Sequence, residues 1–92
     1  MKISVEYFGQ LQHITGIRTE AVEVSEGSTI SSLILTLAEQ YGDRFRDFVY
    51  NSDGSLRKSL PVVVNDRQIS YGEDPALQDS TRIMILSPIA GG

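Results

Sequence analysis

The sequence predicts a single α+β domain, in which a mixed sheet of four to five strands packs on one main helix. Three observations lead to this prediction. Segments 2–7, 17–24, 60–65 and 82–86 alternate apolar with polar residues or cluster β-branched ones, as strands do. Residues 30–41 carry an apolar stripe at helical spacing. The chain has 92 residues, enough for one modest core, and it contains no linker-like segment or internal repeat.

The N-terminal part predicts two antiparallel strands. Ile3, Val5 and Tyr7 alternate with polar residues, which is typical of a half-buried strand. Phe8 breaks the alternation because it falls on the polar face. Residues 9–16 are interpreted as a turn region, and residues 17–24 resume the alternation as a second strand.

The main helix is predicted to begin after Ser28 or Thr29, either of which can cap its first free amides. Its apolar stripe consists of Ile30, Leu33, Ile34, Leu37, Ala38 and Tyr41. Gly42 stands where a left-handed helix cap belongs. Residues 43–50 are ambiguous, because their apolar residues have helical spacing but the segment is short.

The second half predicts three more strands. Residues 60–65 form one, with Pro61 at its start or on a sheet edge, and 68–70 form a short edge strand after a turn at 65–67. Residues 71–80 are expected to be a loop with one helical turn near Ala76. Residues 82–86 form the last strand. Known sheets with this element order place the first and last strands side by side and parallel at the centre.

Composition argues against several classes of function. The chain has no Cys and one His, so it lacks disulfides, thiolate metal sites and a cysteine nucleophile, and no metal site is expected. Its net charge is −4 and it has no basic stripe, which argues against nucleic-acid binding. Nothing in it resembles a membrane span or a signal peptide, so we expect a cytoplasmic protein that does not bind membranes.

The sequence resembles the MoaD/ThiS family of ubiquitin-like sulfur carriers, whose fold is the β-grasp. The matching residues span most of the chain: Tyr7-Phe8-Gly9-Gln10-Leu11, Thr15-Gly16, Gly27, Thr29, Leu33, Leu37, Tyr41, Val64-Asn65, Pro75-x-Leu77-x-Asp79, and Ile83 to Gly92. One departure is Asp79-Ser80-Thr81, where the family usually has Asp-Gly-Asp, and it puts the conformation of that loop in question.

The resemblance implies a sulfur carrier that is not itself an enzyme and binds no cofactor. An E1-like adenylating enzyme would use ATP to activate the carboxylate of Gly92, and sulfur transfer would then give a thiocarboxylate. The leading assignment is the small subunit of molybdopterin synthase, which implies as partner its large subunit or another sulfur-accepting enzyme. The alternatives are a carrier for cysteine or thiamin biosynthesis, a ubiquitin-like modifier joined to lysines, and an interaction module with an inert tail.

The predicted domain covers residues 1–87, and residues 88–92 are expected to be a flexible tail ending in Gly91 and Gly92. Glycines leave the reactive carbonyl unhindered, so the tail could lie in a narrow channel. Pro88 fixes its own φ and stiffens the exit, and Ile89 and Ala90 complete the tail. Fully extended, residues 88–92 reach roughly 16–18 Å.

An apolar patch for partner binding is predicted beside the tail. Phe8, Met84 and Leu86 fall on the face opposite the main apolar set of the first and last strands. If the helix covers that main set, these three side chains are partly exposed, as at many protein interfaces. Val62 and Val64 share one face of their strand and extend the patch if the face is this one.

Overall fold

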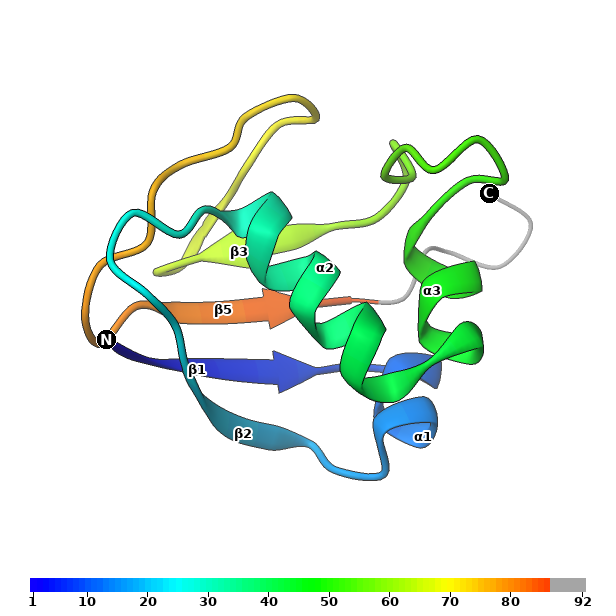
Figure 1. Cartoon of the computed structure of the whole chain (residues 1–92), viewed down its shortest axis with the longest axis horizontal. Coiled ribbons are helices and arrows are strands. Elements are labelled where there is room, and N and C mark those ends of the chain that lie inside the picture. The colour runs from blue at the N-terminus through cyan, green and yellow to red at the C-terminus, as the bar shows by residue number, and fades with distance from the viewer. Residues whose placement is uncertain (87–92) are drawn as a thin grey trace.

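A computed structural model describes residues 1–86; residue 87 and the predicted tail, residues 88–92, lie outside the described residues. The elements follow in this order: β1 (Lys2–Tyr7), α1 (Gln10–Thr15), β2 (Thr19–Glu23), α2 (Ile30–Tyr41), α3 (Asp43–Val49), β3 (Val62–Val64), β4 (Arg67–Gln68) and β5 (Arg82–Ile85). Figure 1 shows α2 lying across one face of the sheet.

The sheet confirms the predicted mixed topology. Its five strands run in the order β2-β1-β5-β3-β4. β1 and β5 are parallel at the centre, with Val5 opposite Ile83 and Tyr7 opposite Ile85. All other neighbours are antiparallel. The last strand is therefore hydrogen-bonded along both edges.

The core lies between the sheet and α2, as predicted from the helical stripe. Thr29 caps α2: its hydroxyl accepts from the Ser32 amide, and the Ser32 hydroxyl accepts from the Thr29 amide in return. The buried apolar residues are Ile3, Val5, Tyr7, Leu11, Ile30, Leu33, Ile34, Leu37, Ala38, Phe45, Val49, Leu60, Val62, Leu77, Ile83 and Ile85. Tyr41 is only partly buried and packs against this set.

Two short helices extend the predicted architecture. The interpretation of residues 9–16 as a turn region was wrong, because Gln10–Thr15 form α1. Leu11 is fully buried beneath it, and Gly16 ends it in the left-handed conformation. One buried side chain is enough to anchor a six-residue helix, but it leaves too little periodicity to be recognised in the sequence. The ambiguous segment after Gly42 forms α3, anchored by Phe45 and Val49.

Three smaller expectations need correction. Gly42 has a positive φ of 88°, but its ψ of −159° is not that of a left-handed cap, and it joins α2 directly to α3. β4 begins at Arg67, because Asn65 and Asp66, both with positive φ, complete a two-residue turn. No helical turn forms near Ala76, which instead makes a β-bridge to Thr29.

The loop before β5 is held firmly despite its departure from the family pattern. Ser80 has a φ of 67°, a conformation that glycine adopts more easily. The amide of Lys2 donates to Asp79 over 3.0 Å, and the amide of Ser80 donates to the Lys2 carbonyl over 2.9 Å. Thr81 is buried, and its hydroxyl donates to the Gln78 carbonyl over 2.6 Å. Serine therefore takes the turn that glycine usually provides.

Candidate functional site

The end of β5 is the point from which the chain continues toward Gly92. On one side, the amide of Phe8 donates to the Ile85 carbonyl over 3.1 Å. On the other, the amide of Leu86 donates to the Pro61 carbonyl over 3.1 Å. The last described residues are thus fixed between β1 and the start of β3.

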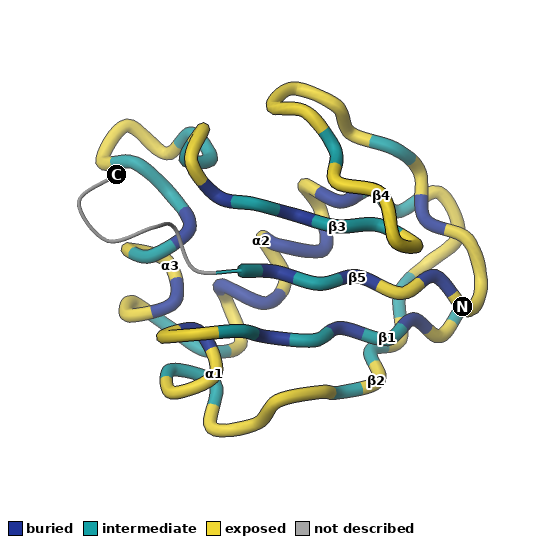
Figure 2. The backbone as a smooth tube through the Cα atoms, turned by 180° about the vertical axis from the view of Figure 1, so that it is seen from behind, coloured by how far each residue is buried: buried dark blue, intermediate teal, exposed yellow. Residues whose placement is uncertain are grey.

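The face of the sheet away from α2 carries an apolar cluster beside this exit. Phe8, Met84 and Leu86 are half-buried, and Val63 is half-buried opposite Met84. We call these four residues the open-face cluster. Figure 2 views this face, and among residues 1–86 no helix crosses it. The register places Met84 on the face opposite the buried Ile83 and Ile85, and Phe8 and Leu86 continue the same alternation, whereas a partner-binding role of this face stays a prediction.

Val62 and Val64 do not extend this cluster, and their assignment to it is corrected. Val62 is buried and lies opposite Ile85, which faces α2. Val64 lies opposite the buried Ile83 and packs against the core. Val63, between them, faces the other way. The sequence shows three consecutive valines, so only the strand register decides which of them lies outside.

Charged residues that the sequence reasoning did not single out border the open-face cluster. The Arg18 guanidinium lies 5.8 Å from the centre of the Phe8 ring and pairs with Glu6 over 3.3 Å. Farther along β5, Arg82 pairs with Asp66 over 2.7 Å. Exposed pairs of this kind add little stability. Apolar side chains bordered by charges are instead typical of a protein interface.

The strongest electrostatic perturbation lies away from this cluster, on the side of the sheet that faces α2. The hydroxyls of Tyr7 and Tyr41 both donate to one carboxylate oxygen of Glu20, each over 2.5 Å. Burial and this carboxylate raise the pKa of Tyr7 above its ordinary value, and the same causes raise the pKa of Tyr41 to about 12. Both phenols stay neutral near neutral pH. The hydrogen bond from Tyr41 to Glu20 links α2 to β2 and so stabilises their packing. Neutral phenols are poor nucleophiles, so this arrangement is structural.

Within residues 1–86, no group of three or more His, Asp or Glu side chains is placed to hold a metal ion. No helix in this part of the chain is long and apolar enough to cross a membrane. The predicted reactive group, Gly92, lies outside the described residues together with Pro88, Ile89, Ala90 and Gly91. The described residues therefore contribute the open-face cluster and the end of β5, from which the chain continues toward Gly92.

Comparison with solved structures finds several chains with a similar fold. SAMP1 from Haloferax volcanii, a small archaeal modifier protein, has a TM-score of 0.85 at 23% identity, with 100% of both chains covered. A putative molybdopterin converting factor, subunit 1, from Pyrococcus furiosus has a TM-score of 0.74 at 25% identity, covering 97% of this chain and 99% of that one.

A third similar structure is the BexX/CysO complex of Amycolatopsis orientalis, with a TM-score of 0.69 at 25% identity, covering 98% of this chain and 99% of that one. No curated protein sequence matches the chain. The family model described as the ThiS family matches residues 5–92, which is nearly the whole chain including both terminal glycines. With its β-grasp fold, this chain therefore belongs to the ThiS family of ubiquitin-like sulfur carriers and modifiers.

Proposed function

We propose that this protein is a sulfur carrier whose functional group is the carboxylate of Gly92. The single observation that carries the proposal is the match of the family model through residue 92, which includes both Gly91 and Gly92. In the proposed cycle, a carboxylate oxygen attacks the α-phosphorus of ATP and releases pyrophosphate. A sulfide equivalent then displaces AMP at the carbonyl carbon and leaves a thiocarboxylate.

The protein contributes delivery rather than catalysis in this cycle. A carboxylate is a poor electrophile, so the adenylating partner must enclose the carbonyl, and two residues without side chains permit close approach. The open-face cluster is the proposed docking surface, because it is apolar, half-exposed and joined to the exit of β5. ATP would be bound by the E1-like partner.

The leading pathway is molybdenum cofactor biosynthesis, with this chain as the small subunit of molybdopterin synthase and a large subunit as its sulfur-accepting partner. It is supported by the likeness to the putative molybdopterin converting factor subunit. The likeness to CysO, which was solved with BexX, favours a carrier that serves another sulfur-accepting enzyme as the second candidate. Attachment to lysines is the third, supported only at the level of fold by SAMP1.

Adenylation is tested by pyrophosphate exchange into ATP, catalysed by the activating enzyme from the same organism. We expect exchange with the natural chain and none with a variant that carries one alanine appended after Gly92, because the added residue moves the carboxylate. Exchange that persists with the extended chain, or that is absent with both, would contradict the proposal.

The same reaction separates the candidate functions once a sulfide source is added. A sulfur carrier gains one sulfur in place of one oxygen at its C-terminus. A modifier forms lysine-linked adducts instead. Transfer of the sulfur to a molybdopterin precursor by a purified large subunit supports the leading pathway, and failure of that transfer while the thiocarboxylate accumulates supports the second candidate.

A further inference from the structure

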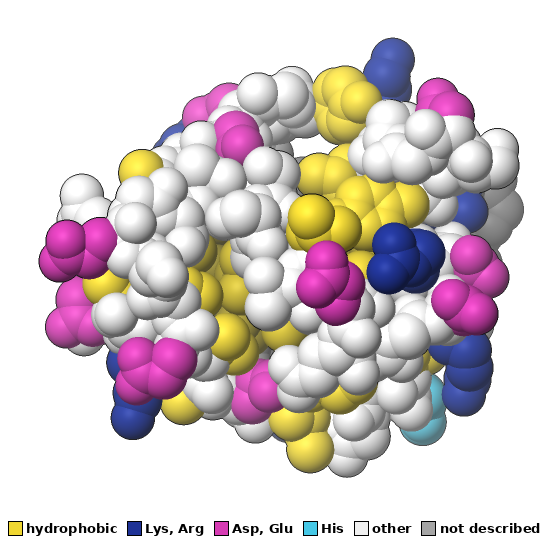
Figure 3. Space-filling model, viewed as in Figure 1, with side chains coloured by type: hydrophobic (Ala, Val, Ile, Leu, Met, Phe, Trp, Pro, Cys, Tyr) yellow, Lys and Arg dark blue, Asp and Glu magenta, His cyan; other side chains and the backbone are white. Residues whose placement is uncertain are grey.

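A groove on the helix side of the molecule is not used by the proposed function. It lies between the N-terminal half of α2, the segment from Leu56 to Pro61 and the loop from Ile69 to Asp74, and it has a volume of about 790 Å³. Its buried floor consists of Ile30, Ile34, Leu60 and Val62. Figure 3 shows the hollow with hydrophobic side chains inside it. A groove of this size can hold several residues of an extended peptide.

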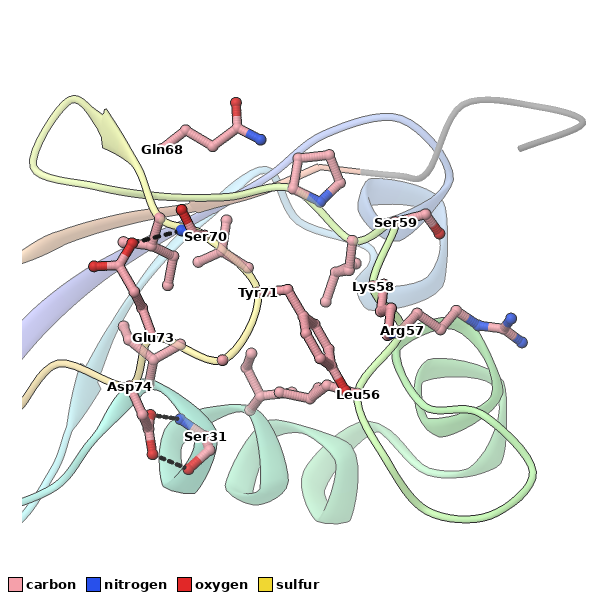
Figure 4. Close-up of a pocket in the computed structure, with 17 residues that line it drawn as sticks. Ser31, Leu56, Arg57, Lys58, Ser59, Gln68, Ser70, Tyr71, Glu73 and Asp74 are labelled. Carbon is pink, nitrogen blue, oxygen red and sulfur yellow. Dashed lines mark hydrogen bonds between the residues drawn. The ribbon is translucent and has the colours of Figure 1, made fainter.

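The two rims of the groove differ in charge. On the loop side, Glu73 pairs with Arg67 over 3.2 Å, and Asp74 accepts from the amide and hydroxyl of Ser31. These carboxylates are already satisfied, as Figure 4 shows for Asp74. On the other side stand Arg57 and Lys58, neither of which forms an ion pair with another described residue. The groove therefore suits an apolar segment that carries a negative charge.

Both basic side chains already have neutral contacts that leave their charge uncompensated. One terminal nitrogen of Arg57 donates to the Asp47 carbonyl over 3.0 Å. The ammonium group of Lys58 lies 5.5 Å from the centre of the Tyr71 ring. Tyr71 is 56% exposed and lies across the groove toward the segment that holds Lys58 (Figure 4). An arriving carboxylate would find two cations beside an exposed aromatic ring.

The C-terminal segment begins at one end of this groove. Pro61 lines the groove and also accepts the hydrogen bond from the amide of Leu86, the last described residue. The six residues 87–92, Ser-Pro-Ile-Ala-Gly-Gly, can reach about 20 Å when extended. Arg57 and Lys58 stand only four and three residues before Pro61, a span of at most about 14 Å. The segment is thus long enough to reach both cations.

We propose that in the unpartnered protein the tail, residues 87–92, docks into this groove of its own chain. Pro88, Ile89 and Ala90 supply the apolar surface, and the carboxylate of Gly92 supplies the negative charge that Arg57 and Lys58 lack. Because the tail is tethered beside the groove, its effective concentration there is in the millimolar range, so a weak contact is enough. Docking holds Gly92 on the helix side, away from the open-face cluster, until a partner withdraws it.

Nuclear magnetic resonance of the isotopically labelled full chain tests the contact directly. We expect nuclear Overhauser effects between the methyl groups of Ile89 and the side chains of Leu60 or Tyr71. We also expect the pKa of the Gly92 carboxyl to rise by about half a unit in the double variant Arg57→Gln/Lys58→Gln, since two nearby cations are removed. The same variant loses the Overhauser effects.

The matched control is Arg44→Gln/Arg46→Gln, which removes the same charge from α3, outside the groove lining. It is expected to leave the Overhauser effects and the carboxyl pKa unchanged. The proposal is overturned if the natural chain shows no such effects, if the control abolishes them equally, or if isotope-filtered spectra show them between two molecules. None of these outcomes depends on whether Gly92 is adenylated, so they are independent of the proposed function.

Discussion

The two faces of the sheet differ sharply, although residues of the same strand form both. On β5, Ile83 and Ile85 point toward α2 and are 1% and 0% exposed, whereas Met84 points the other way and is half-buried, as is Leu86 directly after the strand. The helix side holds nearly all of the core. The open face is nearly as apolar next to the exit of the chain, but within residues 1–86 no helix covers it. We infer that the helix side provides stability and that the open face provides binding.

Truncating a side chain on the helix side tests this division with the largest expected effect. Ile85→Ala removes a fully buried side chain and should lower the free energy of unfolding by about 2–5 kcal/mol. Met84→Ala, its neighbour on the open face, should cost less than about 1 kcal/mol. Urea denaturation followed by circular dichroism measures both. Equal losses of unfolding free energy at Ile85 and Met84 would contradict the inference that the helix side alone provides stability. If Ile85→Ala does not fold, Ile85→Val gives a smaller loss in the same direction.

The tyrosine pair bonded to Glu20 gives the helix side a pH dependence. The pKa values of Tyr7 and Tyr41 are raised in the folded protein. The two phenols therefore make their full contribution to the free energy of unfolding below about pH 10, the ordinary tyrosine pKa. It is lost as the pH rises toward and beyond 12, because only the unfolded chain readily releases these protons. We expect the free energy of unfolding to fall by about 2 kcal/mol from pH 10 to 12.

Denaturant titrations at several pH values measure this fall, and the variant Tyr7→Phe should reduce it. A fall of the same size in Tyr7→Phe would show that the phenol bonded to Glu20 is not its source. The open face carries no tyrosine in β1, β3 or β5, so Met84→Ala should leave the pH profile unchanged.

Affinity for the activating enzyme should depend on residues of the open face and not on residues of the helix side, which is the reverse of the pattern expected for stability. Met84→Ser on the open face is expected to weaken binding to the activating enzyme about tenfold, or about 1.4 kcal/mol, because an apolar contact at the centre of the interface is replaced by a hydroxyl. Isothermal titration calorimetry measures the change. Val64→Ala, on the helix-facing side of β3, serves as the control and should leave affinity unchanged. If only Val64→Ala weakened binding, the interface would lie on the helix-facing side of the sheet, which contradicts the assignment of binding to the open face.

The loop before β5 belongs to neither face of the sheet, and a substitution there is expected to change the free energy of unfolding least. Ser80→Gly relieves a left-handed serine and should raise the free energy of unfolding by about 0.5 kcal/mol, after the greater freedom of glycine in the unfolded chain is subtracted. A rise in the midpoint of thermal unfolding, with unchanged affinity for the activating enzyme, is the expected result. A loss of stability would show that the serine is not strained.

The sequence alone was sufficient for the features set by periodicity. The stripe of α2, the alternation of β1 and β5, and the presence of a turn at Asn65 and Asp66 are local consequences of residue order. The sequence does not predict helix α1 or the face of the sheet on which Val63 lies. Helix α1 depends on the burial of a single residue, Leu11, and the face of Val63 depends on the register between β3 and β5. Both are consequences of tertiary packing.

The groove was also missed, because its lining comes from three segments far apart in the chain. Leu60, Ile30 and Tyr71 have no spacing in common, and only the fold brings them together. Nothing in the sequence distinguishes Arg57 and Lys58 from the solvated charges that most arginines and lysines are. Their lack of ion-pair partners among the described residues became visible only in the structure.

The most direct test of the central claim is the intact mass of the C-terminal peptide after the full chain has reacted with ATP, its activating enzyme and a sulfide source. Replacement of one oxygen by sulfur, located at Gly92 by fragmentation, is the predicted result. An unchanged C-terminal peptide, under conditions in which the same enzyme converts a known sulfur carrier, would contradict the claim that Gly92 is the functional group of this protein.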